Sequence, residues 1–176
     1  MYDEKELIGE CISGNRLAEK QLYEQYSARF FGICLRYAES REDAEELLVD
    51  GFIQIFKHLP DFRFQGSFEG WMKRIIIRQA IETLRHKHPL ETVPISGLPL
   101  AEQPGSEPSL QRLEVQEIMQ SVRKLPPVLR SIFNLYAVEG YTHREIAREL
   151  QMKETTVRVY FQRARALLQK ILTEKE

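Results

Sequence analysis

Five prolines between residues 89 and 109 limit what this 176-residue chain can fold into. A proline inside a helix removes one hydrogen bond and clashes with the preceding turn, and this segment has no lysine or arginine. On both sides of it, apolar residues recur every three or four positions, which is the period of an amphipathic helix. The sequence therefore predicts an all-α protein of two small helical domains, over residues 1–88 and 111–176, joined by a flexible, acidic linker over residues 89–110.

The composition is that of a soluble globular protein, with 43% hydrophobic and 29% charged residues. No apolar run is long enough to enter a membrane as a span, and the acidic N-terminus is no secretory signal, so we expect a cytoplasmic protein. Cys11 and Cys34 lie in helical patterns and are expected to be reduced core thiols. His86 and His88 lack companions at a metal-ligand spacing, so we expect no metal site and no cofactor.

Charge is unevenly distributed along the chain, although the net charge is only −1. Residues 1–50 have six basic and twelve acidic side chains, a net charge of −6. Residues 71–88 have five basic and one acidic, and residues 141–170 seven and three, so each of these segments carries +4. This distribution predicts an acidic surface for one partner and two basic surfaces for another.

Residues 141–168 have the size and layout of a helix-turn-helix. Thr142 and Glu145 are spaced as a capping box at the start of the first helix. One side of the second helix is apolar, and the other presents hydroxyl, guanidinium and amide groups that suit the edges of bases in the major groove. The alternative is an ordinary amphipathic helix pair with a solvated basic face.

A helix predicted from Ser40 to about His58 has a complete apolar stripe that includes Ala44 and Phe52. On its opposite side, Val49 and Ile53 lie one turn apart among acidic residues. Two interpretations remain open: scattered surface hydrophobes, or an apolar partner site with an acidic rim.

Four aromatic residues fall within ten positions of a loop-like segment: Phe62, Phe64, Phe68 and Trp71. They either close the end of a helical core or stack on unpaired bases. The following helix, to about Lys87, aligns three arginines within about 40° of one another, which indicates a track for a nucleic-acid backbone. These are Arg74, Arg78 and Arg85.

Three segments, in this order along the chain, together resemble one family of bacterial proteins. The first is residues 44–52 (AEELLVDGF), and the second is residues 66–75 (GSFEGWMKRI) with residues 80–82 and 84–85. The third comprises Leu125, Pro126, Arg130, residues 145–147 (EIA), Leu150, residues 156–158 (TVR) and residues 163–165 (RAR). The chain resembles RNA polymerase sigma factors of the extracytoplasmic-function group of the sigma-70 family, and the resemblance covers both predicted domains.

The resemblance implies a non-enzymatic subunit that binds the β′ and β subunits of core RNA polymerase, reads promoter DNA at the −10 and −35 elements, and has an anti-sigma factor as a further partner. The residues implied in polymerase binding are Glu45, Glu46, Val49, Asp50 and Ile53. Those implied in binding the −10 single strand are Phe62, Arg63, Phe64, Phe68, Trp71, Arg74, Arg78 and Arg85. Those implied in binding the −35 duplex are Arg144, Lys153, Thr155, Thr156, Arg158, Val159, Gln162, Arg163 and Arg165.

The chain departs from the family pattern at several of these positions. Val49 replaces a usual glutamine, which predicts a more apolar polymerase contact, and Arg78 stands where asparagine is common. Gln151 replaces the usual glycine or asparagine of the helix-turn-helix turn, so we expect left-handed strain there. Lys153 replaces a Ser or Thr cap and exchanges a capping hydrogen bond for a phosphate contact.

Two other functions are alternatives to this one. A stand-alone helix-turn-helix regulator with an N-terminal sensor or dimerisation domain explains residues 110–176, but it gives no role to the aromatic and arginine residues between positions 62 and 85. A small helical enzyme needs a convergent catalytic set, and the sequence has no HExxH motif, phosphate loop or Cys/His pairing.

Overall fold

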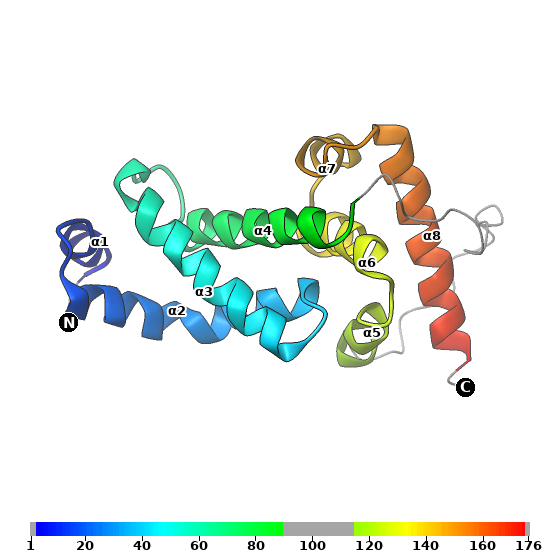
Figure 1. Cartoon of the computed structure of the whole chain (residues 1–176), viewed down its shortest axis with the longest axis horizontal. Coiled ribbons are helices and arrows are strands. Elements are labelled where there is room, and N and C mark those ends of the chain that lie inside the picture. The colour runs from blue at the N-terminus through cyan, green and yellow to red at the C-terminus, as the bar shows by residue number, and fades with distance from the viewer. Residues whose placement is uncertain (1–2, 90–114, 175–176) are drawn as a thin grey trace. The chain divides into compact units, whose positions relative to one another are not determined.

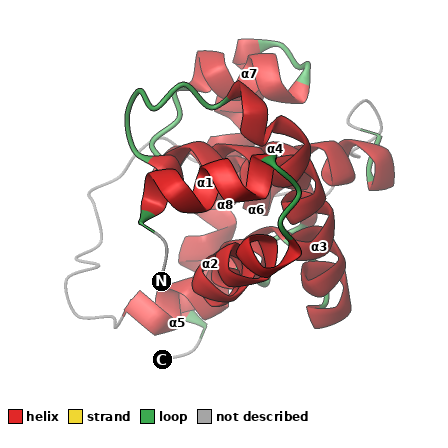
Figure 2. Cartoon of the chain, turned by 90° about the vertical axis from the view of Figure 1, so that its left-hand side faces the viewer, coloured by secondary structure: helices red, strands yellow, loops and turns green. Residues whose placement is uncertain are grey.

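A computed structural model describes residues 3–89 and 115–174. Every regular element in this part of the chain is helical (Figures 1 and 2), which confirms the all-α prediction. The chain forms two compact units, with the division after Thr83. The predicted linker falls almost wholly outside the described residues, so the proposed domain boundaries remain predictions.

The N-terminal unit is built from four α-helices and one short 3-10 turn. They are α1 (Glu4–Ile12), α2 (Arg16–Tyr37), α3 (Arg41–His58), η1 (Leu59–Asp61) and α4 (Phe68–Lys87), whose last four residues lie beyond the division. Side-chain caps fix where the first three helices begin: Asp3 and Glu6 form a capping box, the Asn15 side chain accepts hydrogen bonds from Leu17 N and Ala18 N, and Ser40 accepts one from Asp43 N.

The core of this unit follows the predicted apolar stripes. Phe30 and Leu22 of α2 and Ile55 of α3 are fully buried, as is Ile76 of α4. Gly51 lets α3 approach α4 closely, because a Cβ at this position would overlap Ile76 Cδ1.

Both cysteines are buried and free, as predicted. Burial raises the pKa of Cys11 to about 11 and that of Cys34 to about 12, so both thiols stay protonated at neutral pH.

The C-terminal unit contains α5 (Val115–Val122), α6 (Pro127–Phe133), η4 (Asn134–Val138), α7 (His143–Leu150) and α8 (Glu154–Thr173). The second half of the helical segment from Pro127 to Val138, η4, is π-helical. Its wide turn is closed by hydrogen bonds from Glu139 N to Asn134 O at 3.0 Å and from Tyr141 N to Leu135 O at 2.9 Å. Gly140, at φ 76°, then reverses the chain into α7.

The helix-turn-helix is formed by α7 and α8, and its predicted capping box is present. Thr142 Oγ1 accepts from Glu145 N at 3.2 Å, while Glu145 Oε2 accepts from Thr142 N at 2.8 Å. Ile146 and Leu150 of α7 and Val157 and Ala164 of α8 are buried, so the two helices pack by the predicted stripe. Across the described residues, no helix combines the length and apolar character that a membrane span needs.

Candidate polymerase- and DNA-binding surfaces

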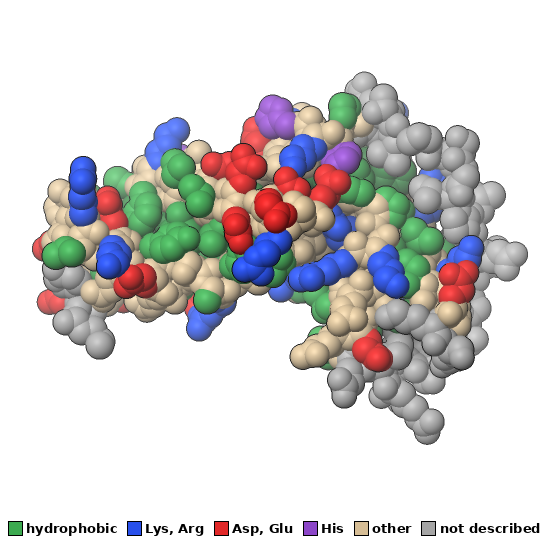
Figure 3. All heavy atoms as spheres, turned by 60° about the horizontal axis from the view of Figure 1, so that its bottom comes forward, with side chains coloured by type: hydrophobic (Ala, Val, Ile, Leu, Met, Phe, Trp, Pro, Cys, Tyr) green, Lys and Arg blue, Asp and Glu red, His purple; other side chains and the backbone are tan. Residues whose placement is uncertain are grey.

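The outward face of α3 keeps the predicted mixture of apolar and acidic side chains. Val49 is 51% and Ile53 56% exposed, and Glu45 and Glu46 are also exposed, while Asp50 is half-buried. Apolar side chains are visible beside acidic ones on the surface of the N-terminal unit (Figure 3). Two exposed aliphatic side chains one turn apart form a small apolar surface with charged neighbours, which suits a protein partner.

Two of the four aromatics predicted to stack on DNA lie in the core. Phe62 is 7% and Phe68 1% exposed, so the prediction that they contact bases is corrected in favour of the core interpretation. The ring of Phe62 lies 5.1 Å from that of Phe68 and 5.2 Å from that of Trp71, and together they close the end of the helical core.

The exposed aromatic of this segment, Phe64, has an unusual backbone conformation. It lies at φ 54° and is 51% exposed, and its ring centre is 5.0 Å from that of Phe62. A left-handed conformation is costly for a bulky residue, and such strain concentrates at functional sites. Gly66, at φ 91°, completes the reversal that leads into α4.

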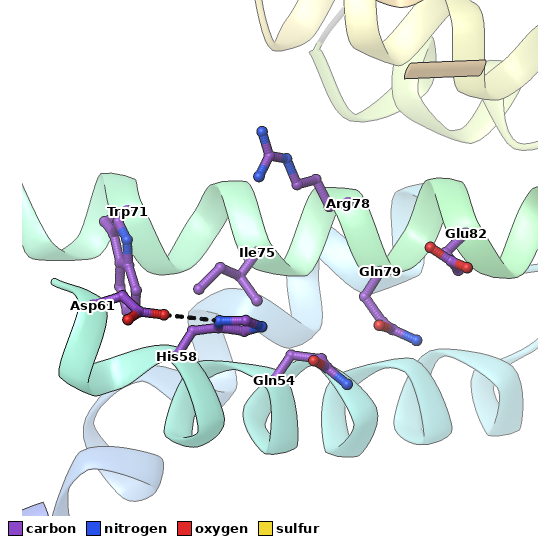
Figure 4. Close-up of a pocket in the computed structure, with 8 residues that line it drawn as sticks. All are labelled: Gln54, His58, Asp61, Trp71, Ile75, Arg78, Gln79 and Glu82. Atoms are coloured by element: carbon purple, nitrogen blue, oxygen red, sulfur yellow. Dashed lines mark hydrogen bonds and ion pairs between the residues drawn. The ribbon is translucent and has the colours of Figure 1, made fainter. Parts of the chain in front are cut away.

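A pocket of about 560 Å³ lies between α3 and α4, within the N-terminal unit. Its lining residues are Gln54, His58, Asp61, Trp71, Ile75, Arg78, Gln79 and Glu82. In Figure 4, Trp71 reaches from α4 towards Asp61, while Arg78 points away from Gln54 and His58 at the rim. His58 Nδ1 lies 3.1 Å from Asp61 Oδ2. The volume is within the range of about 300–1,000 Å³ that is typical of small-molecule sites.

The sequence predicted only Trp71 and Arg78 among the lining residues. A second helical stripe in the sequence indicates further lining residues: Ile75 and Gln79 follow Trp71 at steps of four on α4. Facing them, Gln54 and His58 recur at the same step on α3.

The arginine track of α4 is only partly exposed. Arg74 and Arg78 are exposed one turn apart, whereas Arg85 is half-buried. Arg63, in the aromatic loop, is also exposed. Of these, Arg78 lines the same pocket as Trp71.

The first turns of α8 present most of the predicted duplex-binding residues to solvent. Those that are exposed are Lys153, Thr155, Arg158, Val159, Gln162 and Arg165, together with Arg144 of α7, while Thr156 is half-buried. The prediction that Arg163 contacts the duplex is corrected, because this residue is only 7% exposed. Its guanidinium carbon lies 5.9 Å from the ring centre of Tyr160. Position 163 follows Tyr160 by three residues and precedes the buried Ala164, which places it on the packed side of α8.

The turn between α7 and α8 shows the two expected departures from the family pattern, at Gln151 and Lys153. Gln151 lies at φ 53° and ψ 44°, in the left-handed region, and its backbone N–H reaches Arg148 O at 3.3 Å. Lys153 occupies the N-cap of α8 and makes no capping hydrogen bond with its side chain. The recognition helix therefore begins with an uncapped, cationic end.

Glu154 is a further polar residue of this surface that the sequence did not single out. Its Oε1 accepts a hydrogen bond from Arg158 Nη2 at 2.7 Å. This bond is the main cause of the lowered pKa of Glu154, with smaller contributions from the charges of Arg158, Arg144 and His143. The signal in the sequence was the i, i+4 spacing of an acid and an arginine.

Comparisons with known proteins agree with this layout. The family model described as Sigma-70 region 2 matches residues 22–89, and the model described as Sigma-70, region 4 matches residues 115–168. The chain is 24% identical to ECF RNA polymerase sigma factor SigM of Mycobacterium tuberculosis, over 95% of this chain and 83% of that protein. It is 24% identical to ECF RNA polymerase sigma factor SigW of Bacillus subtilis, over 97% of each protein.

Solved structures share the fold. The sigma factor RpoE, in complex with the anti-sigma factor NepR from Bartonella quintana, has a TM-score of 0.53 at 17% identity, over 88% of this chain and 96% of that one. CnrH, in complex with the cytosolic domain of CnrY, has a TM-score of 0.50 at 22% identity, over 97% of each chain. The two family models match in the predicted order and together span more than half of the sequence. The chain therefore belongs to the sigma-70 family of RNA polymerase sigma factors, in its extracytoplasmic-function group.

Proposed function

We propose that this sigma factor divides promoter reading between a pocket in its N-terminal unit and the exposed face of α8. As a sigma factor it directs promoter-specific initiation by core RNA polymerase, and the polymerase supplies the chemistry of RNA synthesis. The observation that carries the proposal is the pocket between α3 and α4, because its aromatic wall and the exposed arginines beside it suit unpaired DNA.

At the −10 element, a base extruded from the duplex enters the pocket and stacks on Trp71. Phe64, exposed at the tip of the loop, stacks on a neighbouring base. Arg74 and Arg78 follow the phosphates of the same strand, with Arg63 and Arg85 at the two ends of the track. Phe62 and Phe68 support this surface from the core.

At the −35 element, α8 enters the major groove with its N-terminal turns. Thr155, Arg158, Val159 and Gln162 face base edges, where an arginine suits guanine and an apolar side chain suits the thymine methyl group. The remaining exposed cations of this surface, Arg144, Lys153 and Arg165, and the half-buried Thr156, bind the flanking phosphates.

The α3 face is the proposed polymerase-docking surface. Val49 and Ile53 form its apolar centre, and Glu45, Glu46 and Asp50 form the acidic rim that pairs with cations of the β′ subunit. Contacts to the β subunit are proposed for the C-terminal unit. An anti-sigma factor that covers Val49 and Ile53 would block assembly, and the factor works where core polymerase is, in the cytoplasm.

The test is transcription in vitro with purified core polymerase on genomic fragments, followed by mapping of the start sites. Wild-type protein should direct initiation at defined promoters. Arg158→Ala and Gln162→Ala should change the preference for −35 sequences, whereas Arg74→Ala should slow promoter opening and leave duplex selection unchanged. Lys20→Ala removes an exposed cation outside both DNA surfaces and should behave as wild type.

The outcome against the proposal is identical transcription by wild type and all three site variants. A chain that bound duplex DNA tightly by itself and failed to co-purify with core polymerase would instead support a stand-alone regulator.

A further inference from the structure

Glu154 is the only acidic residue between positions 153 and 165, the stretch of α8 that the proposed function places in the major groove. A carboxylate close to DNA phosphates is repelled by them, so its presence on a basic reading face needs an explanation. Glu154 is partly exposed, with 39% of its side chain accessible, so it is not a core residue.

The geometry around Glu154 ties it to one particular base-reading candidate. Its Oε1 lies 2.7 Å from Arg158 Nη2, and both side chains remain accessible at the surface, at 39% and 63%. The charge of Arg144, at the start of α7, also stabilises the carboxylate form. Glu154 is therefore ionised at neutral pH.

A purely local role explains part of this arrangement. An acidic residue in the first turn of a helix complements the helix dipole, and an acid followed four residues later by an arginine adds further helix stability. The helix-dipole effect does not depend on the direction in which the guanidinium points, whereas the i, i+4 pair requires it to lie near the carboxylate. The hydrogen bond does fix that direction, and it does so for a side chain that otherwise has large rotamer freedom.

We infer that Glu154 is a positioning residue that holds Arg158 for bidentate recognition of a guanine in the −35 element. Arginine has five N–H donors, and one is used by Glu154, so enough remain for the O6 and N7 acceptors of guanine. Adenine presents an amino donor in place of O6 and cannot accept both bonds. The inference rests on the proposed function, because it requires α8 to read the −35 duplex.

Removal of the carboxylate should separate specificity from affinity. Without Glu154 the guanidinium is free to turn towards phosphates, so the preference for guanine at one −35 position should fall by about three- to tenfold. Binding to unrelated duplex DNA should rise, because one negative charge has left the basic face. A residue that served only helix stability would lower the melting temperature and leave base preference unchanged.

The experiment uses the full chain with core polymerase on promoters that carry each of the four bases at every −35 position. Glu154→Ala should lose guanine preference at the same position as Arg158→Ala. In the double variant the effect of Glu154→Ala should vanish, since it acts through Arg158. Glu154→Gln retains a hydrogen-bond acceptor and should restore part of the preference.

A matched control comes from the other end of α8. Glu174 lies 3.8 Å from Lys170 in another i, i+4 pair, outside the reading face, and Glu174→Ala should leave base preference unchanged. Melting temperatures of all variants show that folding is retained. If wild type and Arg158→Ala behave as proposed but Glu154→Ala keeps full guanine preference, the inference alone is wrong. If wild type directs no promoter-specific transcription, the proposed function is wrong as well.

Discussion

The two proposed DNA-binding surfaces are built on different principles. The α8 face is convex and comes from one short stretch of sequence, so its chemistry can be read directly from a helical repeat. The pocket between α3 and α4 is concave and brings Gln54 next to Gln79, residues that are distant in sequence. The α8 face depends on which side chains point outward, and the pocket depends on how α3 and α4 pack. Changes to packing should therefore affect the two surfaces unequally.

The largest expected effect comes from the core aromatic beneath the pocket. Phe68→Ala should lower the free energy of unfolding by about 3–5 kcal/mol, because Phe68 is fully buried against Phe62 and Tyr26. Phe64→Ala is the matched change at an exposed aromatic, and it should leave stability nearly unchanged while it reduces open-complex formation. Urea unfolding and transcription assays separate these effects. Equal loss of stability in both variants would contradict the division between core and contact residues.

Next in size is a change at the closest approach of α3 and α4. Gly51→Val should destabilise the protein by about 1–3 kcal/mol, since the new side chain must displace the buried Ile76. The same variant should impair promoter opening more than −35 selection, because the pocket shares this helix contact. Gly32→Ala is the control: a Cβ there meets no atom within 4 Å, and alanine should stabilise α2 slightly. Unchanged stability of Gly51→Val would show that the helix pair can repack freely.

A smaller effect, of opposite sign, is expected in the helix-turn-helix. Gln151→Gly should stabilise the protein by about 1 kcal/mol, because glycine adopts the left-handed conformation without a clash of its Cβ. Gln151→Ala keeps the Cβ and should give no such gain. Thermal unfolding measures both variants. A Gly variant that melted below the Ala variant would show that the Gln151 side chain itself stabilises the turn.

The smallest effect concerns pH. Burial, followed by the charge of Arg158, lowers the pKa of His143, whose ring stacks on Tyr136 at 4.4 Å. Because the unfolded state then binds the proton more readily, the stabilising contribution is complete above the ordinary histidine pKa and is lost as the pH falls towards the lowered value. The melting temperature of the wild type should therefore fall further between pH 7 and 5.5 than that of His143→Gln. Equal losses would contradict this assignment.

Local rules in the sequence predicted the helices well, and tertiary contacts explain most of what they missed. Ser40 and the Thr142–Glu145 pair marked helix starts because caps are short-range hydrogen bonds. The burial of Phe62 and Phe68 depends on how the loop folds back over α4, which no linear pattern records. We have no local explanation for the π-helical turn that begins at Asn134.

The same limit applies to the binding surfaces. The exposed residues of α8 were predicted from one helical wheel, apart from Arg163, which lies at the edge of the apolar stripe. The lining of the pocket needed the relative placement of two helices. Asp61 carries no motif of its own and becomes a pocket residue only through packing.

Three sides of helix α3 make different contacts, and these contacts can couple two binding events. Val49 and Ile53 face the proposed polymerase contact, Gly51 packs on α4, and Gln54 and His58 form a wall of the pocket. A shift of α3 relative to α4 on docking would change the width of the pocket, because the same backbone carries both sets of side chains. Coupling between two binding events is reciprocal. If polymerase raises the affinity of the pocket for a base by some factor, a bound base raises the affinity for polymerase by the same factor.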